Sequence, residues 1–103
     1  MNEVTQELVD EFKERMKLSD DEDSNLTRIL EASVEDLVDK CGPYDLNTSA
    51  RFKELVFERS RYVYNDALEY FNSNFLTQIN SLAISKAFKT PSIIVVEGDA
   101  IET

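Results

Sequence analysis

The sequence contains no histidine and no tryptophan, and only one cysteine, two glycines and two prolines among 103 residues. Without histidine, the chain lacks the usual general base and the most common zinc ligand. Two glycines are too few for a glycine-rich phosphate-binding loop. The scarcity of both turn residues also disfavours a β-sandwich or barrel, which needs many tight turns. We therefore expect a helical protein that is not an enzyme and has no cofactor.

Disulfides and long hydrophobic runs are also missing. Cys41 is the single cysteine and cannot form an internal bridge, so its place at the end of an apolar helical stripe predicts a small core residue. The longest apolar run, Ile93 to Val96, is far too short to span a membrane. The acidic, polar first residues do not resemble a signal peptide. We expect one small domain that is soluble and is made in a reducing cytoplasm.

Acidic residues outnumber basic ones by 21 to 11, giving a net charge of -10. Because proteins that follow nucleic-acid phosphates present clustered Lys and Arg, sequence-specific or non-specific nucleic-acid binding is disfavoured. The charge is uneven, with -9 over residues 1–48, +1 over 49–88 and -2 over the remainder. This asymmetry has two interpretations of equal weight. The two halves meet head to tail in an oligomer, or the charges simply solvate the surface.

Apolar residues recur at helical spacing over four segments. Two local signals mark boundaries of the second: Ser19 with Glu22 has the pattern of a capping box, and Gly42 followed by Pro43 stops a helix. The predicted helices cover about 3–17, 22–41, 48–71 and 75–88, with Thr48 or Asn47 capping the third and Ser73 a candidate cap for the fourth.

These segments predict an all-α fold, a small bundle of about four helices followed by an extended C-terminal tail. The helical domain is expected over residues 1–89 and the tail over 90–103. Ile93, Ile94, Val95 and Val96 read as a short strand without a partner in this chain.

The third predicted helix is apolar on two faces, one of them aromatic. Such a helix lies centrally in its domain or packs against another subunit. The residues in question are Tyr62, Tyr64 and Phe71, for which the intramolecular core is the favoured interpretation and a subunit contact the second.

Carboxylates gather at two places. Asp20, Asp21, Glu22 and Asp23 suit a helix N-terminus, and the alternative is a site for a divalent cation in an enzyme. The spacing of an EF-hand fails, because no glycine sits at the turn and no glutamate closes the loop. Glu35 and Asp39 could in principle act as an acid–base pair, but carboxylates on an exposed helix face are expected to be solvated charges.

Two stretches resemble the head–tail connector (adaptor) proteins of long-tailed bacteriophages, especially those of Gram-positive hosts. The first runs from Ile29-Leu30-Glu31-Ala32-Ser33 through Leu37 to Cys41-Gly42. The second is Arg61-Tyr62-Val63-Tyr64-Asn65-Asp66-Ala67-Leu68-Glu69-Tyr70-Phe71, followed by Asn74-Phe75-Leu76. Together they place the resemblance over roughly residues 20–88.

The resemblance implies a structural protein of the virion, at the interface of head and tail. Connectors of this family form a ring, usually twelvefold, below the portal protein, extend the DNA channel, and dock a downstream stopper or tail-completion protein. It also implies that the C-terminal segment reaches the portal protein, which here assigns that role to Ile93, Ile94, Val95 and Val96. Asp20, Asp21, Glu22 and Asp23 are the candidates for lining the channel, where negative charge would let DNA slide.

A different class of function remains open from the residues alone. An acidic helical protein of this size can act as a regulatory module that mimics DNA and blocks a basic partner. The apolar β-branched segment near the C-terminus separates the two hypotheses, since a DNA mimic has no need for it.

Overall fold

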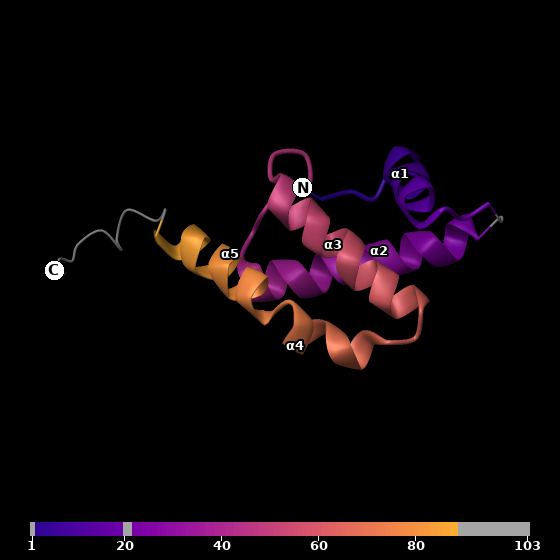
Figure 1. Cartoon of the computed structure of the whole chain (residues 1–103). Coiled ribbons are helices and arrows are strands. Elements are labelled where there is room, and N and C mark those ends of the chain that lie inside the picture. The colour runs from indigo at the N-terminus through magenta and orange to yellow at the C-terminus, as the bar shows by residue number, and fades with distance from the viewer. Residues whose placement is uncertain (1, 20–21, 89–103) are drawn as a thin grey trace, which may run out of the picture.

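The computed structural model describes residues 2–19 and 22–88, and every regular element in those ranges is helical (Figure 1). The predicted all-α fold is therefore confirmed. The predicted tail over 90–103, with its strand, lies outside the described residues. The elements are α1 (Gln6–Met16), α2 (Asp23–Cys41), α3 (Ala50–Tyr64), the 3-10 turn η1 (Leu68–Tyr70), α4 (Phe71–Asn74) and α5 (Leu76–Phe88).

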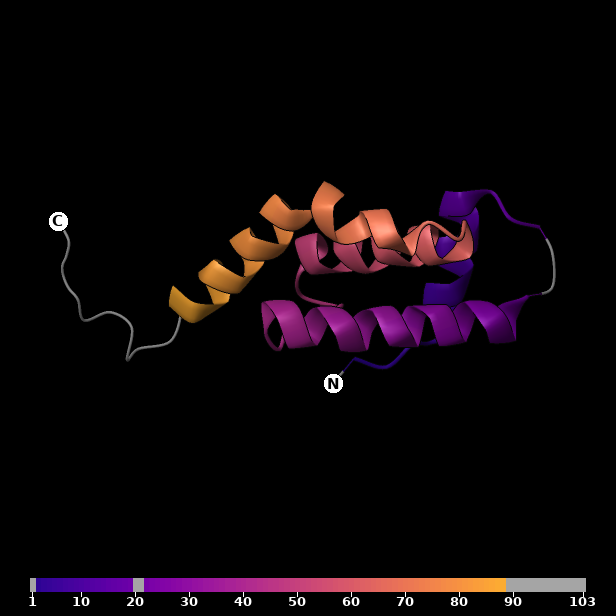
Figure 2. The ribbon, with the colours of Figure 1, turned by 90° about the horizontal axis from the view of Figure 1, so that it is seen from below.

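The helices form two layers. Figure 2 shows α2 in one layer and α3 with α4 in the other, while α1 lies across one end of both. From α4 the chain continues into α5, which slants past the C-terminal end of α2 (Figure 2). Because α5 crosses the end of the bundle, its flanks are less covered than those of α2.

Aromatic and aliphatic side chains from all the long helices fill the space between these layers. Phe12 of α1, Phe52 of α3 and Phe71 of α4 are almost completely buried. The rings of Phe12 and Phe57 lie 5.5 Å apart, which ties α1 to α3. Burying one such ring contributes about 2–3 kcal/mol, so these contacts hold the layers together.

The start of α1 follows its sequence closely, whereas the start of α2 does not. The Thr5 hydroxyl accepts from the amide of Leu8 and caps α1. The capping box predicted from Ser19 and Glu22 is wrong, because α2 begins after Glu22, whose side chain makes no capping bond. Contacts with α1 fix this end instead: the Asp23 carboxylate accepts from Lys13 at 2.9 Å and from Gln6 at 2.8 Å.

Both predicted ends of α3 need correction. Ser49 caps the helix, not Thr48 or Asn47, because Asp45 organises those two residues into a preceding turn. The helix also stops at Tyr64 and does not reach Phe71.

The early stop of α3 has a local cause. Asp66 adopts a left-handed conformation with φ 57°, and the amides of Asp66 and Ala67 donate to the carbonyls of Val63 and Tyr62. This pattern is a Schellman motif, which satisfies the last carbonyls of a helix. It turns the chain so that η1 and α4 can pack back against α3.

Ser73 is not a helix cap, contrary to the prediction. It lies inside α4, and its hydroxyl donates to the carbonyl of Tyr70. The break falls at Phe75 instead, the residue between α4 and α5. Its ring packs against Phe71 and Tyr62, with centroids 5.1 and 5.8 Å away, so burial of an aromatic side chain decides the position of the bend.

Candidate functional site

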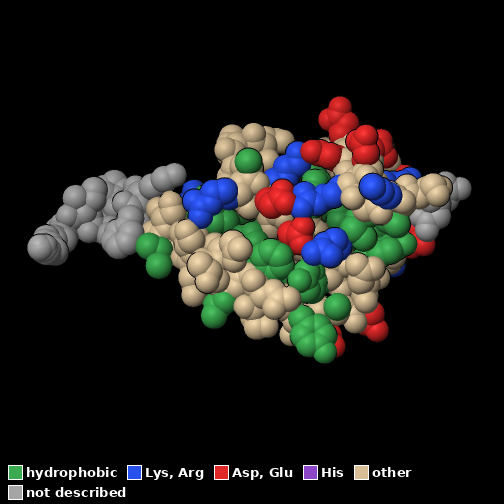
Figure 3. Space-filling model, in the orientation of Figure 1, with side chains coloured by type: hydrophobic (Ala, Val, Ile, Leu, Met, Phe, Trp, Pro, Cys, Tyr) green, Lys and Arg blue, Asp and Glu red, His purple; other side chains and the backbone are tan. Residues whose placement is uncertain are grey.

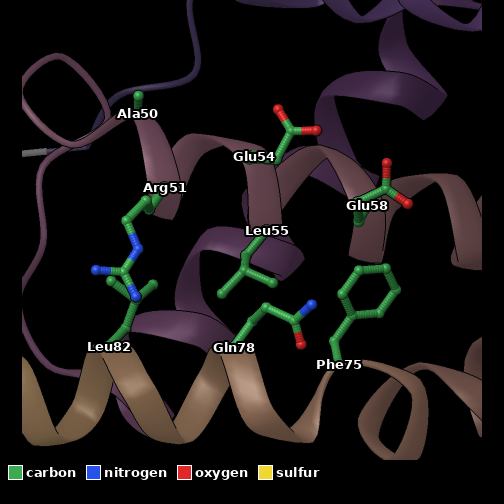
Figure 4. Close-up of a pocket in the computed structure, with 8 residues that line it drawn as sticks. All are labelled: Ala50, Arg51, Glu54, Leu55, Glu58, Phe75, Gln78 and Leu82. Atoms are coloured by element: carbon green, nitrogen blue, oxygen red, sulfur yellow. The ribbon is translucent and has the colours of Figure 1, made fainter.

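A groove of 540 Å³ runs between α3 and α5 (Figure 4). Leu55 of α3 and Leu82 of α5 are buried at its floor, and the half-buried ring of Phe75 closes one end. Polar side chains line its edges. The complete lining consists of Ala50, Arg51, Glu54, Leu55, Glu58, Phe75, Gln78 and Leu82. An apolar floor with polar edges is typical of a surface that binds a peptide or protein segment.

The two carboxylates at the α3 edge already have cationic partners. Arg15 of α1 donates to Glu54 and, at 2.6 Å, to Glu58. Arg61 donates to Glu58 at 2.6 Å. The hydrogen bond from Arg15 lowers the pKa of Glu54, and the bond to Glu54 raises the pKa of Arg15. The edge is therefore charged but locally neutralised.

Arg51 differs from the other cations of α3. Its guanidinium donates to the hydroxyl of Ser81 at 2.7 Å, and it forms no ion pair with any described residue. It lies at the end of the groove next to Leu82 (Figure 4). This end is thus the electropositive one.

A second apolar surface lies away from the groove. The side chains of Leu76 and Ile84 are 54% and 55% exposed, although both belong to α5. Successive residues of a helix are separated by about 100°, so Leu76 projects on nearly the opposite flank from Gln78. Tyr70 of η1 is also exposed. Figure 3 shows hydrophobic side chains at several points along the lower edge of the molecule.

Several polar contacts fix α5 on the body. The Tyr44 hydroxyl donates to the carbonyl of Leu82 at 2.7 Å, and the Lys86 ammonium stands 4.4 Å from the centre of the Tyr44 ring. The Cys41 thiol donates a long hydrogen bond to the carbonyl oxygen of Ile79, with 3.8 Å between sulfur and oxygen. These contacts attach α5 to the end of α2 and to the loop that follows it.

Cys41 occupies the place predicted for it. The side chain is 2% exposed, and burial raises the pKa of its thiol. A buried thiol with a raised pKa is a core residue and a poor nucleophile.

The three predicted aromatic residues lie on the inner side of α3 and α4. Phe71 is buried in the core, and Tyr62 packs edge-on against it at 5.8 Å. Tyr64 is half-buried against the same core. Their places match the intramolecular interpretation, and the question of subunit contacts stays a prediction.

Of the four carboxylates predicted for the channel or a cation site, two are described. Glu22 and Asp23 are half-buried at the start of α2, and the hydrogen bond from Lys13 lowers the pKa of Asp23. Asp20 and Asp21 lie outside the described residues, as do the predicted portal-binding residues Ile93, Ile94, Val95 and Val96. Within the described ranges, no cluster of three or more His, Cys, Asp or Glu residues is close enough to hold a metal ion.

The complementary charges of the two halves meet inside one molecule. Lys53 of α3 pairs with Glu11 of α1 at 2.8 Å, and Arg59 pairs with Asp36 of α2 at 3.1 Å. Blue and red side chains alternate accordingly over this part of the surface (Figure 3). Two cations of α3 are therefore used for packing this helix against α1 and α2.

The groove was missed by reasoning from the sequence. One signal was present, since Leu76 and Ile84 do not share a face with Ile79 and Leu82, so α5 is apolar on more than one side. No pattern indicates that α3 and α5 stand far enough apart to leave a groove.

Comparison with known proteins gives no relative. No protein-family model, no curated protein and no solved structure matches this chain. In addition, none of the described helices has the length and apolar character needed to cross a membrane.

Proposed function

We propose that this protein is a head–tail connector subunit of a long-tailed bacteriophage, forming a ring below the portal protein. The ring would extend the DNA channel and dock a downstream stopper or tail-completion protein. The sequence resemblance gives the class of protein, and its two stretches fall on α2 and on the continuous path from the end of α3 to the start of α5. No reaction is part of this proposal.

One structural observation carries the proposal: α5 has two different apolar surfaces. The α3–α5 groove lies on one flank, and exposed Leu76 and Ile84 lie elsewhere on the same helix. A closed ring is built from head-to-tail contacts, so each subunit needs two unlike surfaces that fit one another. The exposed side chains of Leu76 and Ile84, here called the apolar ridge, and the α3–α5 groove are two such surfaces.

The remaining parts of the proposal concern the partners. Residues 93–96 would contact the portal protein by adding a strand to it, because their apolar β-branched side chains suit strand addition. A net charge of -10 would keep DNA from adhering to the ring. Asp20, Asp21, Glu22 and Asp23 are the proposed channel-facing carboxylates.

The test is to mix the purified protein with tailless heads that carry the portal protein and to image the vertex by electron microscopy. We expect a ring of added density below the portal. The Leu76→Asp variant should fold but fail to form the ring, because it places a charge on the apolar ridge. Thr48→Asp, which adds the same charge to an exposed residue of the turn before α3 and away from both apolar surfaces, is the control and should still form it. No added density with the unmodified protein would refute the proposal.

The regulatory alternative is supported by one observation. Glu31, Glu35 and Asp39 are exposed and follow one another at intervals of four residues along α2. Such a row of carboxylates on one helix face can imitate a row of phosphates. Binding to a basic protein from the host, abolished by Glu35→Gln and accompanied by no rings, would favour this function instead.

A further inference from the structure

We propose that residues 93–96 of the free chain occupy the α3–α5 groove of the same molecule, so that the segment meant for the portal protein first covers this chain's own apolar surface. The inference deepens the proposed function and rests on it for its purpose. It rests on the groove and on chain length for its geometry. The groove and residues 93–96, which are both required for assembly, would thereby cover each other until a partner displaces the segment.

Chain length permits this placement. Helices rise about 1.5 Å per residue, so Leu82 lies about 9 Å back along α5 from its last residue, Phe88. The four residues 89–92 can span up to about 14 Å. Ile93 can therefore reach the level of Leu82, and Val96 can lie about 10 Å further along, at the level of Gln78 and Phe75. The apolar run is thus long enough to cover the floor of the groove.

The chemistry of the groove fits this occupant. Leu55, Leu82 and Phe75 supply an apolar floor for four β-branched or aliphatic side chains. Acidic residues follow the apolar run, at Glu97 and Asp99. They meet no uncompensated carboxylate at the edge, because Glu54 and Glu58 already accept from arginines.

The consequence is a coupling between portal binding and ring formation. While residues 93–96 lie in the groove, the ridge of a neighbouring subunit cannot enter it. When the portal protein takes the segment, the groove becomes free for the neighbour. Subunits would then assemble on the portal and remain single elsewhere, which prevents rings from forming at the wrong place.

The absence of tryptophan makes a direct test possible. Val95→Trp in the full chain introduces the only tryptophan of the protein. We expect its fluorescence to be blue-shifted and less quenched by acrylamide than that of a free peptide of residues 90–103 with the same substitution. Both properties should be independent of protein concentration, because the contact is intramolecular.

A matched pair of second substitutions locates the contact. Gln78→Glu adds a carboxylate inside the groove, close to Glu54 and Glu58, and should shift the Val95→Trp emission to the red. Thr77→Glu adds the same charge to α5 but not to the groove lining, and should leave the emission unchanged. A second measurement without tryptophan guards against distortion by the large ring: Ile94→Asp should shift the methyl NMR signals of Leu55 and Leu82.

Three outcomes would overturn the inference. Emission that equals the free peptide, together with unchanged methyl signals, means that the groove is empty in the free chain. Emission that depends on concentration means that a second copy supplies the segment. Equal effects of the two glutamate substitutions mean that the contact lies elsewhere. Since these measurements need no phage head, their failure is separate from a failure to form rings on the portal.

Discussion

At the scale of single residues, Gly42 ends α2 in a backbone conformation that favours glycine. Its backbone has φ 107° and ψ 174°, a combination that only glycine adopts without strain. The amide of Gly42 still donates to the carbonyl of Val38, which closes α2. A β-carbon at this position would also stand 2.9 Å from the Cγ atom of Lys86. The backbone conformation and the nearby Lys86 side chain both disfavour alanine here.

We therefore predict that Gly42→Ala lowers the free energy of unfolding by about 1–3 kcal/mol, measured by urea denaturation. The double variant Gly42→Ala with Lys86→Ala separates the two causes, because it removes the crowded side chain but keeps the strained backbone. Most of the loss should remain in the double variant. Full recovery would show that crowding, and not φ, is the reason for glycine.

Glu54 contributes a stability that depends on pH. Hydrogen bonding from Arg15 lowers its pKa below the ordinary value of 4.5, so the folded state favours the ionised carboxylate. The resulting stabilisation is present above pH 4.5 and is lost as the pH falls through the lowered pKa of the folded state. Because this carboxylate is 59% exposed, solvent screens the interaction and limits it to about 0.5 kcal/mol.

The expected result for Glu54→Gln is a small loss of stability at pH 7 that becomes smaller at about pH 3, because the Glu54 carboxylate takes up a proton as the pH falls through its lowered pKa. Thermal unfolding at the two pH values measures it. Glu7→Gln is the control, since Glu7 is exposed and is bonded to no described residue. An equal loss at both pH values would contradict an electrostatic origin.

At the scale of elements, a buried polar contact sets how α2 lies against α3. Ser33 and Ser60 are completely buried, and the Ser60 hydroxyl donates to Ser33 at 2.9 Å. Arg59 adds a bond to Ser33 at 3.1 Å and another to Asp36. Small hydroxyl side chains let the two helices approach closely, and their bonds hold one register.

A double-mutant cycle tests this account. Ser33→Ala should cost about 1–3 kcal/mol, because it leaves the Ser60 hydroxyl and one Arg59 donor without their acceptor. Adding Ser60→Ala removes the buried hydroxyl that lost its partner, so the second substitution should cost little further and the two effects should be clearly non-additive. Urea denaturation of the four chains measures the coupling. Simple additivity would mean that the two hydroxyls do not interact.

At the scale of the whole molecule, the described core is complete before the last fifteen residues. Among the described residues, every buried side chain lies between positions 8 and 82. A chain that ends at Lys89 should therefore unfold with nearly the same cooperativity and helical content as the full chain. Under the proposed function it should nevertheless fail to attach to portal-bearing heads.

Circular dichroism and head-attachment assays on the same preparation check both halves of this prediction. The full chain with Glu97→Gln serves as a control that keeps the apolar segment intact. If the shortened protein attaches as well as the full chain, residues 93–96 do not dock the portal protein. If it fails to fold, the C-terminal segment belongs to the core.

Prediction from the sequence succeeded where local physics decides. The helical spacing of apolar residues over 3–17 predicted α1, and Gly42 with Pro43 predicted the end of α2. It failed where competing local contacts are nearly equal in energy. The end of α3 at Tyr64 depends on an unusual left-handed Asp66, and aspartate favours that conformation too weakly to be anticipated.

The sequence by itself determined the class of fold, the existence and order of the four long helices and the buried role of Cys41, because periodic burial of apolar side chains is a local property of the chain. Only the tertiary structure decided that the acidic and basic halves pair within one molecule, and that α5 leaves a groove beside α3. Those features depend on distances between residues far apart in the chain, such as Lys53 and Glu11 or Leu55 and Leu82, which packing fixes and spacing along the sequence does not.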